Sequence, residues 1–468
     1  MMSKTHNQSQ ILMEITIIEV VANIISKTNG FLWSYLVTYL CLGSAFYFSF
    51  KLKFFQFKAL KQSISVLKED KKYNKNDGSI SNFQALTATI AGAVGLGNIA
   101  GVAIAIQIGG PGAVFWMWVT ALIGMAVRYA ETFLAIYYQE SSKDGKKHFG
   151  GPIYYIKKGL KKKYHFLATF FAIFTFIGAA GTGALYQSNQ VASILSSEFG
   201  IAEYITGITI CILVAMVIFG GIKRIGSVTE KLVPIMCISY VGVALILILL
   251  NIAVIPEVLF SIVKNAFIIN SAIGGGIGSV IAIGVQRAIF SNESGLGTTP
   301  VIYGAVKKSK DIVKQASVSV LSPFIDTIIV CSATALIILI AGNNAAHQSG
   351  EITGILLTVQ SFSDLMLPHA AIFIAIIASL LAFSTMITWA YYGEISFTYL
   401  FGAKSSFIYK IFFLTAIFIG SINELQLIIN ASDLLIALMV IPNVIALILL
   451  RKVIFKNTFK KLIKNAGN

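Results

Sequence analysis

Long apolar runs separated by short polar segments recur along the whole chain. A transmembrane helix needs about 20 apolar residues, and a scan with a window of about 19 residues predicts eleven such spans. They cover approximately residues 31–50, 84–106, 113–138, 166–197, 202–221, 232–251, 266–299, 317–341, 368–394, 409–422 and 429–450. The strand-like alternation that a membrane β-barrel requires is not evident. The pattern therefore predicts an all-α polytopic membrane protein.

Composition supports this class, because 56% of the 468 residues are hydrophobic and only 12% are charged. A soluble protein of this length needs more charged surface. The net charge of +16 comes from lysines in short segments between apolar runs, which argues against a nucleic-acid-binding face. The four cysteines lie inside apolar runs without metal-ligand spacing, so neither a disulfide framework nor a zinc site is predicted.

Basic residues collect in every second connection between the predicted spans. Of the 36 lysines and arginines, 31 lie in residues 51–75, 139–165, 221–231, 301–315, 401–410 and after 450. The positive-inside rule assigns these segments to the cytoplasm. We therefore expect a multi-pass protein of the cell membrane, in contact with lipid, whose N-terminus is outside and whose C-terminus is cytoplasmic.

Ten spans follow the first one, and they divide into two sets of five. Because five is odd, two halves built alike must cross the membrane in opposite directions, as in inverted-repeat transporters. The sequence Gly-Leu-Gly occurs in the first span of each half, at residues 95–97 and 295–297. The predicted organisation is an N-terminal segment with the first helix and a basic cytoplasmic loop (1–83), a first five-helix repeat (84–251), a second five-helix repeat (252–450) and a basic cytoplasmic tail (451–468).

The stretch AGAVGLGNIAG, residues 91–101, places four glycines and one asparagine inside the second span. Each glycine costs about 1 kcal/mol relative to alanine in a helix interior, so this composition favours local unwinding. Unwound backbone at membrane depth is tolerated only where it is buried in protein or lines a cavity. There its N–H groups can bind a carboxylate and its carbonyls a cation. Close helix packing through Gly97 and Gly101 is the alternative interpretation.

The stretch AIFSNESGLGTTP, residues 288–300, places four consecutive polar residues before the two glycines of the seventh span. Polar groups at such a position usually face the bundle interior or a water path, so a second discontinuous span is predicted. For Glu293 we expect an ion pair with Arg287 in preference to a role in coupling.

Three other ionisable residues lie within predicted spans. Asp326 is a candidate carrier of an ion or a proton, and an internal hydrogen-bonding role is the alternative. Arg128 and Glu131, three residues apart, are expected to form a structural pair near the cytoplasmic end with lipid or loop contacts. No serine–histidine–acid grouping and no phosphate-binding loop is visible, so the chain is not expected to be an enzyme.

Several of these segments resemble the alanine or glycine:cation symporter family. The matching pieces are GNIAGVA, IGGPGAVFWMW, GMAVRYAE and GGPIYYIKKGL in the first half, and RAIFSNESGLG, FIDT and WAYYGE in the second. They are distributed from about residue 84 to 443, which is nearly the whole chain. The resemblance implies symport of sodium with a small neutral amino acid through a leucine-transporter-like fold.

The resemblance also implies roles for residues at the first break. Backbone N–H groups would meet the amino-acid carboxylate, and oxygens would bind sodium as the coupling ion. The N–H groups belong to Gly95, Leu96 and Gly97. The oxygens belong to the carbonyls of Ala93 and Val94 and to the amide of Asn98. Oxygen ligands without cysteine or histidine suit a hard cation.

Further roles are implied in three other spans. Phe290 would wall the pocket, Ser291 would ligate sodium, and the backbone from Ser291 through Asn292 to Glu293 would receive the substrate ammonium. Ser384 and Thr385 match the hydroxyl pair of another sodium site. The remaining substrate-binding candidates are Gln187, from the polar stretch GALYQSNQ, and Trp389.

One departure from the family leaves the substrate open. This chain has GLGN where GTGN is more common, so Leu96 removes a hydroxyl group from the site. The alternative functions are a proton-coupled amino-acid transporter that uses Glu293 or Asp326, and a channel or non-transporting amino-acid sensor. The oligomeric state is not predicted.

Overall fold

The computed structural model describes residues 20, 22–69, 80–142, 145, 147–267, 276–342, 354–366, 369–423 and 425–466, and this part of the chain is almost entirely helical. The first 19 residues, the end of the predicted basic loop at 70–79 and the start of the predicted seventh span at 268–275 lie outside the described residues. Helical structure carries the hydrogen bonds of the backbone within each segment, which an apolar environment requires.

The elements of the described residues follow one another along the chain. The N-terminal ones are η1 (Leu32–Val37), α2 (Thr38–Lys51) and α3 (Phe55–Glu69). Next come α4 (Asn82–Ala93), η4 (Gly97–Gly101), α5 (Val102–Gly109), α6 (Gly112–Tyr137), β1 (Glu140–Ser141), β2 (His148–Phe149), α7 (Pro152–Gly159), η5 (Lys162–Tyr164), α8 (Phe166–Gly178), η6 (Ala179–Leu185), α9 (Tyr186–Phe199), α10 (Glu203–Ile218) and α11 (Gly221–Leu250). The remaining ones are η7 (Ile252–Val254), α12 (Ile255–Asn265), α13 (Gly276–Asn292), α14 (Thr299–Tyr303), α15 (Ile312–Ser317), η9 (Val318–Val320), α16 (Leu321–Pro323), η10 (Phe324–Cys331), α17 (Ser332–Ile340), α19 (Ile355–Met366), α20 (Ala370–Phe401), η11 (Ala403–Ser405), α21 (Ser406–Ser421) and α22 (Leu425–Ala466).

Among the described residues, eight helices are long and apolar enough to cross a membrane, or nine when one bent pair counts as a single span. The two predicted spans outside this set coincide with α10, which has 16 residues, and α13, which has 17. The prediction of a polytopic helical membrane protein is therefore confirmed. The number of eleven spans stays a prediction, and so does the division into two repeats of five.

Three segments that were predicted as loops or tails are helical instead. Residues 55–69 form α3, α11 already begins at Gly221 and so includes residues 221–231, and α22 continues to Ala466. Lysine and glutamate are good helix formers, so a basic segment does not by itself end a helix. Glu230, in the part of α11 that was predicted as a loop, accepts a hydrogen bond from Gln84 Nε2 at 3.0 Å.

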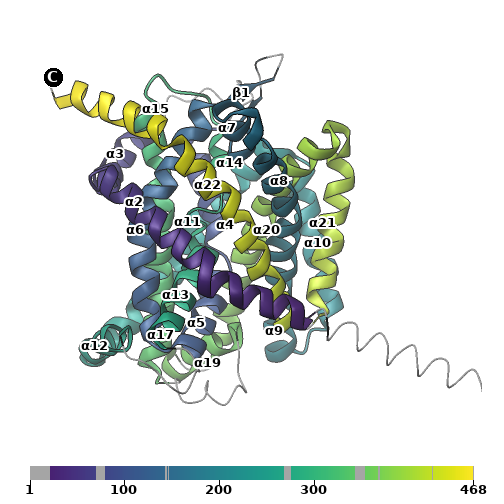
Figure 1. Ribbon diagram of the computed structural model, residues 1–468. Helices are drawn as coiled ribbons and strands as arrows, with labels where there is room; N and C mark the ends of the chain where they lie inside the picture. Colours follow the sequence, from purple (N-terminus) through teal and green to yellow (C-terminus); the bar gives the residue numbers. More distant parts are fainter. Residues whose placement is uncertain are drawn as a thin grey trace, which may run out of the picture.

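The basic segments of the sequence lie together at one end of the molecule, as their places in Figure 1 show. One end carries α3, α7, α15, β1 and the C-terminal end of α22, where the basic segments lie. The opposite end carries α5, α9, α12, α17 and α19. The continuous N-terminal helix Ala22–Lys51, which ends with α2, runs from this second end toward α3 at the first. This separation agrees with the alternation of basic connections in the sequence, and the assignment of the basic end to the cytoplasm remains a prediction from the positive-inside rule.

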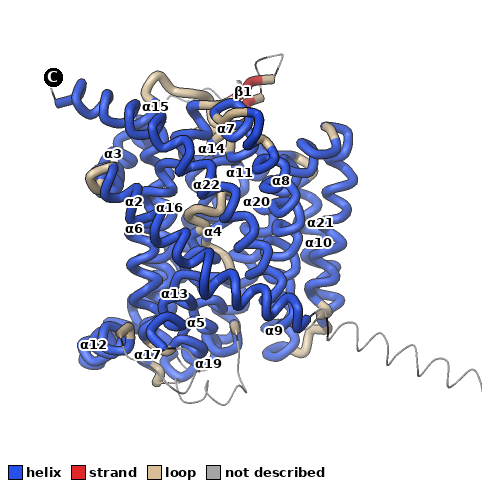
Figure 2. Tube along the Cα trace, in the orientation of Figure 1, coloured by secondary structure: helices blue, strands red, loops and turns tan. Residues whose placement is uncertain are grey.

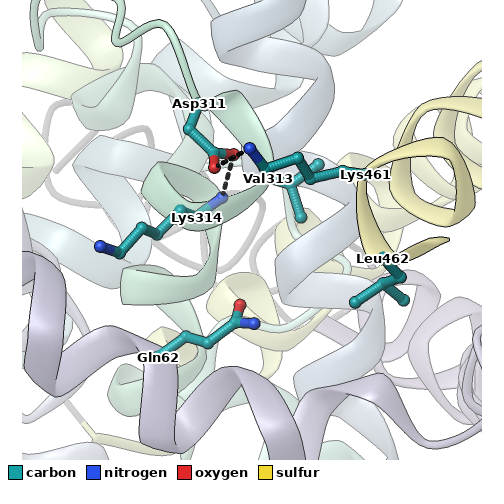
Figure 3. A pocket seen from close by; sticks show the side chains of 6 residues that line it. All are labelled: Gln62, Asp311, Val313, Lys314, Lys461 and Leu462. Atoms are coloured by element: carbon teal, nitrogen blue, oxygen red, sulfur yellow. Dashed lines mark hydrogen bonds and ion pairs between the residues drawn. The ribbon is translucent and has the colours of Figure 1, made fainter. Parts of the chain in front are cut away.

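Hydrogen bonds and ion pairs join three helices at the basic end, and Figure 3 shows those of Asp311. The Asp311 carboxylate caps α15 by accepting a hydrogen bond from the Lys314 backbone N–H at 3.0 Å. The same carboxylate lies 2.9 Å from Lys461 Nζ on α22, and Lys314 Nζ lies 2.7 Å from Glu69 on α3. These partly exposed pairs each contribute about 0–1 kcal/mol, so they position α15 more than they stabilise the fold.

Two helices are interrupted in the middle of the molecule, where Figure 2 shows loop segments surrounded by helices. Helix α4 begins with a capping box of Ser81 and Gln84 and ends at Ala93, and the following helix from Gly97 to Gly109 is bent from it by 50°. Helix α13 ends at Asn292, and α14 begins at Thr299. The predicted discontinuities in the second and seventh spans are therefore present in the fold.

Candidate functional site

The first break, Val94 to Leu96, exposes backbone N–H groups that bond to neutral amides. The Leu96 N–H donates to Gln187 Oε1 at 3.1 Å. The Gly95 N–H donates to Asn98 Oδ1 at 3.1 Å and is also 2.9 Å from the Ala93 carbonyl. Gln187 and Asn98 are both almost completely buried. Three predicted residues, Leu96, Gln187 and Asn98, thus meet at one point of the backbone.

Helix α20 contacts the carbonyl end of α4 through two side chains. Thr385 Oγ1 donates to the Ala91 carbonyl at 2.9 Å, and Trp389 Nε1 donates to the Gly92 carbonyl at 3.1 Å. Ser384 instead donates to the Leu381 carbonyl of its own helix at 2.9 Å. Of the hydroxyl pair predicted from the sequence, Thr385 is the one that contacts the first break, and the carbonyl that it meets lies before Ala93 and Val94.

The first break packs closely against the residues before the second break. A β-carbon on Gly97 would lie 2.9 Å from the Phe290 ring, so glycine is required for this approach. The Phe290 ring also contacts Tyr186, with ring centroids 4.9 Å apart. Phe290 therefore lies between the two broken helices, as a wall of the predicted pocket would.

A carboxylate joins the two breaks. Asp326 on η10 accepts hydrogen bonds from Asn98 Nδ2 at 2.6 Å and from Ser291 Oγ at 2.7 Å. It also accepts one from Thr327 Oγ1 at 2.8 Å, and the Cys331 thiol lies 3.1 Å from Ser291 Oγ. All five side chains are buried. Two of the side chains predicted to bind sodium, Asn98 and Ser291, are thus brought together at Asp326.

The second break, Glu293 to Thr298, is held by charged side chains from α6. Arg128 Nη2 donates to the Asn292 carbonyl, and Glu131 Oε1 accepts from the Gly297 N–H at 3.1 Å. The two side chains are fully buried, with 3.9 Å between Arg128 Nη1 and Glu131 Oε2. The predicted pair therefore exists, but the expectation of lipid or loop contacts is wrong, because both residues face the broken helix.

Asn443 on α22 completes this group. Its Nδ2 donates to Glu131 Oε1 at 2.5 Å and to the Gly295 carbonyl at 2.8 Å, and its Oδ1 accepts from the Tyr155 hydroxyl. We call Arg128, Glu131 and Asn443 the second-break clamp. Sequence reasoning missed Asn443, although a buried amide within an apolar span was an available signal.

Glu293 does not pair with Arg287. The Arg287 guanidinium forms a buried ion pair with Asp433 on α22, so the predicted pair is wrong. Glu293 Oε2 accepts from Thr298 Oγ1 at 2.5 Å, while its Oε1 has no hydrogen-bond partner within the described part of the chain. A β-carbon on Gly92 would lie 3.5 Å from this oxygen, which places it beside the end of α4. The side chain therefore bridges the second break and faces the first.

Asparagine, serine, threonine and carbonyl oxygens dominate this region. No group of three or more histidine, cysteine, aspartate or glutamate residues within the described chain could hold a metal ion. Hydroxyl, amide and carbonyl oxygens suit a hard cation of low charge. The π-helical segments η4, η6 and η10 lie beside the first break, before Gln187 and around Asp326, respectively, and π-helical turns are frequent at functional sites.

Two broken helices in a polytopic bundle, with main-chain groups, amides and hydroxyls gathered between them, define a secondary transporter. The model of the sodium:alanine symporter family matches residues 18–465, so the chain belongs to this family. Membership of this family makes the protein an amino-acid symporter of the membrane and not an enzyme.

Named relatives agree with the family. The sodium/alanine symporter AgcS of Methanococcus maripaludis is 39% identical, over 95% of this chain and 98% of the relative. A putative sodium/proton-dependent alanine carrier protein, YrbD of Bacillus subtilis, is 40% identical over 92% of this chain and 90% of the relative. The resemblance noted in the sequence is therefore confirmed.

Solved structures show the same fold at low sequence identity. The crystal structure of MhsT in complex with L-phenylalanine has a TM-score of 0.54 and 16% identity, covering 79% of this chain and 88% of that chain. A manganese transporter of Eremococcus coleocola also has a TM-score of 0.54, with 13% identity over 79% of this chain and 78% of that chain. These similarities support the predicted leucine-transporter-like fold.

Proposed function

We propose that the chain carries a small neutral amino acid into the cell together with sodium, by alternating access to a site between the two breaks. The observation that carries this proposal is the meeting of the two broken helices. Asn98 follows the first break, Ser291 precedes the second, and both bond to Asp326. A ligand that binds between them contacts both broken helices at once.

The backbone of the first break suits the substrate carboxylate. The Leu96 N–H now donates to the neutral oxygen of Gln187, and a carboxylate is a stronger acceptor of the same proton. The N–H groups of Gly95 and Gly97 complete the proposed carboxylate site. Because a β-carbon on Gly95 would lie 3.2 Å from Gln187 Oε1, a side chain here would fill that place.

The substrate ammonium is assigned to the second break. The Asn292 carbonyl already accepts from Arg128, and the Glu293 carbonyl accepts from the Leu296 N–H at 3.1 Å. The acceptors that we propose are the Ser291 carbonyl, the remaining lone pair of the Glu293 carbonyl and the unpartnered Glu293 Oε1. Phe290 and Trp389 wall the pocket. A β-carbon on Gly183 would lie within 2.7 Å of the Trp389 ring, and such close packing favours a small substrate side chain.

Sodium is assigned to two places. The first uses Asn98 Oδ1, Ser291 Oγ and the Ala93 carbonyl, and the second uses Thr385, Ser384 and the carbonyls of Ala91 and Val94 at the end of α4. A cation at either place stabilises unwound backbone of the first break and so favours the conformation that binds the amino acid. This coupling is reciprocal, since the amino acid then raises the affinity for sodium by the same factor.

Proton coupling is the second candidate, because Asp326 and Glu293 are buried carboxylates without a basic partner among the described ion pairs. Replacing sodium by choline at constant pH separates the two functions. We expect amino-acid uptake into proteoliposomes to stop without sodium. Uptake that continues unchanged contradicts sodium coupling, and downhill flux without accumulation favours the channel.

The substitution Asn98→Ala tests the sodium assignment. The substitution removes one neutral group that binds a charged ion, which costs about 1.5–3 kcal/mol. The sodium concentration for half-maximal uptake should therefore rise about tenfold to hundredfold. The control is Asn251→Ala, whose amide donates to the Leu247 carbonyl at 2.9 Å at the end of α11. An unchanged sodium dependence in folded Asn98→Ala protein contradicts the assignment.

A further inference from the structure

We infer that Asp326 is a positioning residue of the proposed sodium site, which it serves by holding the hydrogens of Asn98 and Ser291 so that their oxygens face the ion. The inference rests on the proposed function, because it presupposes that sodium binds at Asn98 and Ser291. It assigns a distinct role to a third residue, on a different helix.

The hydrogen bonds at Asp326 fix which atom of Asn98 faces the first break. Asn98 Nδ2 donates to Asp326 Oδ1 at 2.6 Å and lies 3.2 Å from the Asp326 carbonyl. Its Oδ1 is therefore turned to the other side, where it accepts from the Gly95 N–H at 3.1 Å. An amide oxygen has two lone pairs, so one remains for a cation at the break.

The same argument applies to the hydroxyl of Ser291. It has one hydrogen, and it donates this hydrogen to Asp326 Oδ2 at 2.7 Å. The lone pairs of Ser291 Oγ then point away from Asp326. The Cys331 thiol, 3.1 Å away, can donate to one of them, which leaves the other for a cation. The carboxylate accepts at both of its oxygens and orients one side chain beside each break.

Charge supports the same role. Asp326 is fully buried, and none of the ion pairs among the described residues includes it. A buried carboxylate that forms no direct ion pair is unfavourable even when it is hydrogen-bonded. A cation bound at the adjacent oxygens adds positive charge to that of Arg128, which acts on Asp326 without forming an ion pair with it. Hydrogen bonds that metal ligands donate to carboxylates commonly set ligand orientation, and their loss lowers metal affinity by about 10–100-fold.

The test is sodium binding by the purified full-length protein, without amino acid, followed as the rise in unfolding temperature during a sodium titration. In Asp326→Asn we expect the half-saturating sodium concentration to rise about 10–100-fold, with the maximal uptake rate at saturating sodium largely kept. The matched control is Asp364→Asn, an exposed aspartate on α19, which should leave the titration unchanged. Unchanged sodium binding in folded Asp326→Asn overturns the inference.

A double-mutant cycle separates positioning from a general structural effect. If Asp326 acts through Asn98, then Asp326→Asn should add less than threefold to the half-saturating sodium concentration of Asn98→Ala, because coupled residues are not additive. Fully multiplicative effects overturn the inference. If Asp326→Asn does not fold, the same sodium titration on Asp326→Glu tests the inference. This variant keeps the charge and displaces the oxygens, so a raised half-saturating concentration supports the inference and an unchanged one overturns it.

The outcomes also distinguish this inference from the proposed function. A wild-type protein that neither binds sodium nor needs it for uptake contradicts the proposed function itself. A different result contradicts only the inference. If the wild type depends on sodium, while Asp326→Asn binds sodium normally but loses the pH dependence of uptake, then Asp326 carries a proton.

Discussion

The two breaks are held by different kinds of groups. At the first, the partners are neutral: Gln187 binds the Leu96 N–H, and Thr385 and Trp389 bind the carbonyls of α4. At the second, Arg128 and Glu131 bind the backbone directly, and both are fully buried ions. The helix is interrupted in both places, but the free energy needed to separate the backbone from its side-chain partners differs between them.

This difference separates a break that exchanges partners from one that is fixed. A neutral hydrogen bond contributes about 0.5–1.5 kcal/mol, so a substrate carboxylate or a sodium ion can replace the partners of the first break at small cost. Removing one member of a buried ion pair costs about 3–5 kcal/mol, so the second-break clamp does not open readily. We expect the first break to respond to ligands and the second to serve as a rigid support.

The largest expected effect is that of Glu131→Gln, which tests the charged clamp. Glutamine can still accept the hydrogen bond from the Gly297 N–H, but the buried Arg128 loses its counter-charge. The free energy of unfolding should fall by about 3–5 kcal/mol. Denaturant unfolding in detergent, with the yield of monodisperse protein, measures this loss.

The control for this substitution is an exposed ion pair. Glu140 and Lys158 lie 3.1 Å apart with exposed fractions of 46% and 40%. The substitution Glu140→Gln should change the free energy of unfolding by less than about 1 kcal/mol. Equal losses in Glu131→Gln and Glu140→Gln mean that charge does not hold the second break, and the comparison of the two breaks then fails.

Sequence reasoning located both breaks and, through the family resemblance, named Gln187, Thr385 and Trp389, which bond to the first. It did not predict the contacts that hold the second break. Glycine clusters and consecutive polar residues predicted where the helices unwind, because both features are unfavourable in an apolar helix. The prediction that Arg287 pairs with Glu293 was wrong, because the sequence suggests only neighbours along one helix. The actual partner, Asp433, lies 146 positions away. The amide of Asn443, 148 positions from Gly295, could only be noticed as a polar residue within an apolar run.

The role of Arg128 and Glu131 shows the same limit. Their spacing of three residues predicted a pair on one helical face, and the pair exists. Which element that face meets depends on how α6 packs against α13 and α14, and the spacing contains no information on packing. Helix ends were also misplaced, because charged residues at the membrane boundary allow α11 and α22 to continue beyond the apolar core.

A smaller effect is expected at the glycines, and it differs between the breaks. Gly295 has φ +88°, and a β-carbon on this residue would lie 3.6 Å from its nearest neighbour, Val444. Gly295→Ala therefore introduces backbone strain without a clash. We expect a loss of about 1–2 kcal/mol in the free energy of unfolding, with little change in substrate KM.

Gly95 lacks a positive φ, but its β-carbon would meet Thr385 Oγ1 and Gln187 Oε1. Gly95→Ala should instead raise KM, because it fills the proposed carboxylate site.

The control for both is Gly101→Ala. No atom lies within 4 Å of its built β-carbon, and its φ of −67° is helical. Alanine should leave KM unchanged and stabilise the helix by up to about 1 kcal/mol. Uptake assays and unfolding on the same three preparations check the pattern. A rise in KM for Gly295→Ala as large as that for Gly95→Ala removes the distinction between support and binding site.

The smallest expected effect is that of Trp389→Phe, which removes a single neutral hydrogen bond at the first break. Its Nε1 donates to the Gly92 carbonyl at 3.1 Å, and phenylalanine keeps most of the apolar volume. Trp116→Phe is the matched control, since Trp116 Nε1 donates to the Ala266 carbonyl at 3.0 Å, away from both breaks. Each variant should lose about 0.5–1.5 kcal/mol in the free energy of unfolding. Only Trp389→Phe should also change substrate KM, roughly twofold to tenfold, because Trp389 walls the proposed pocket and its carbonyl partner belongs to the backbone that we expect to exchange partners with ligands. A KM that is unchanged in both variants would show that this carbonyl stays fixed during transport, and the first break would then be as rigid at its α4 end as the second break is along its whole length.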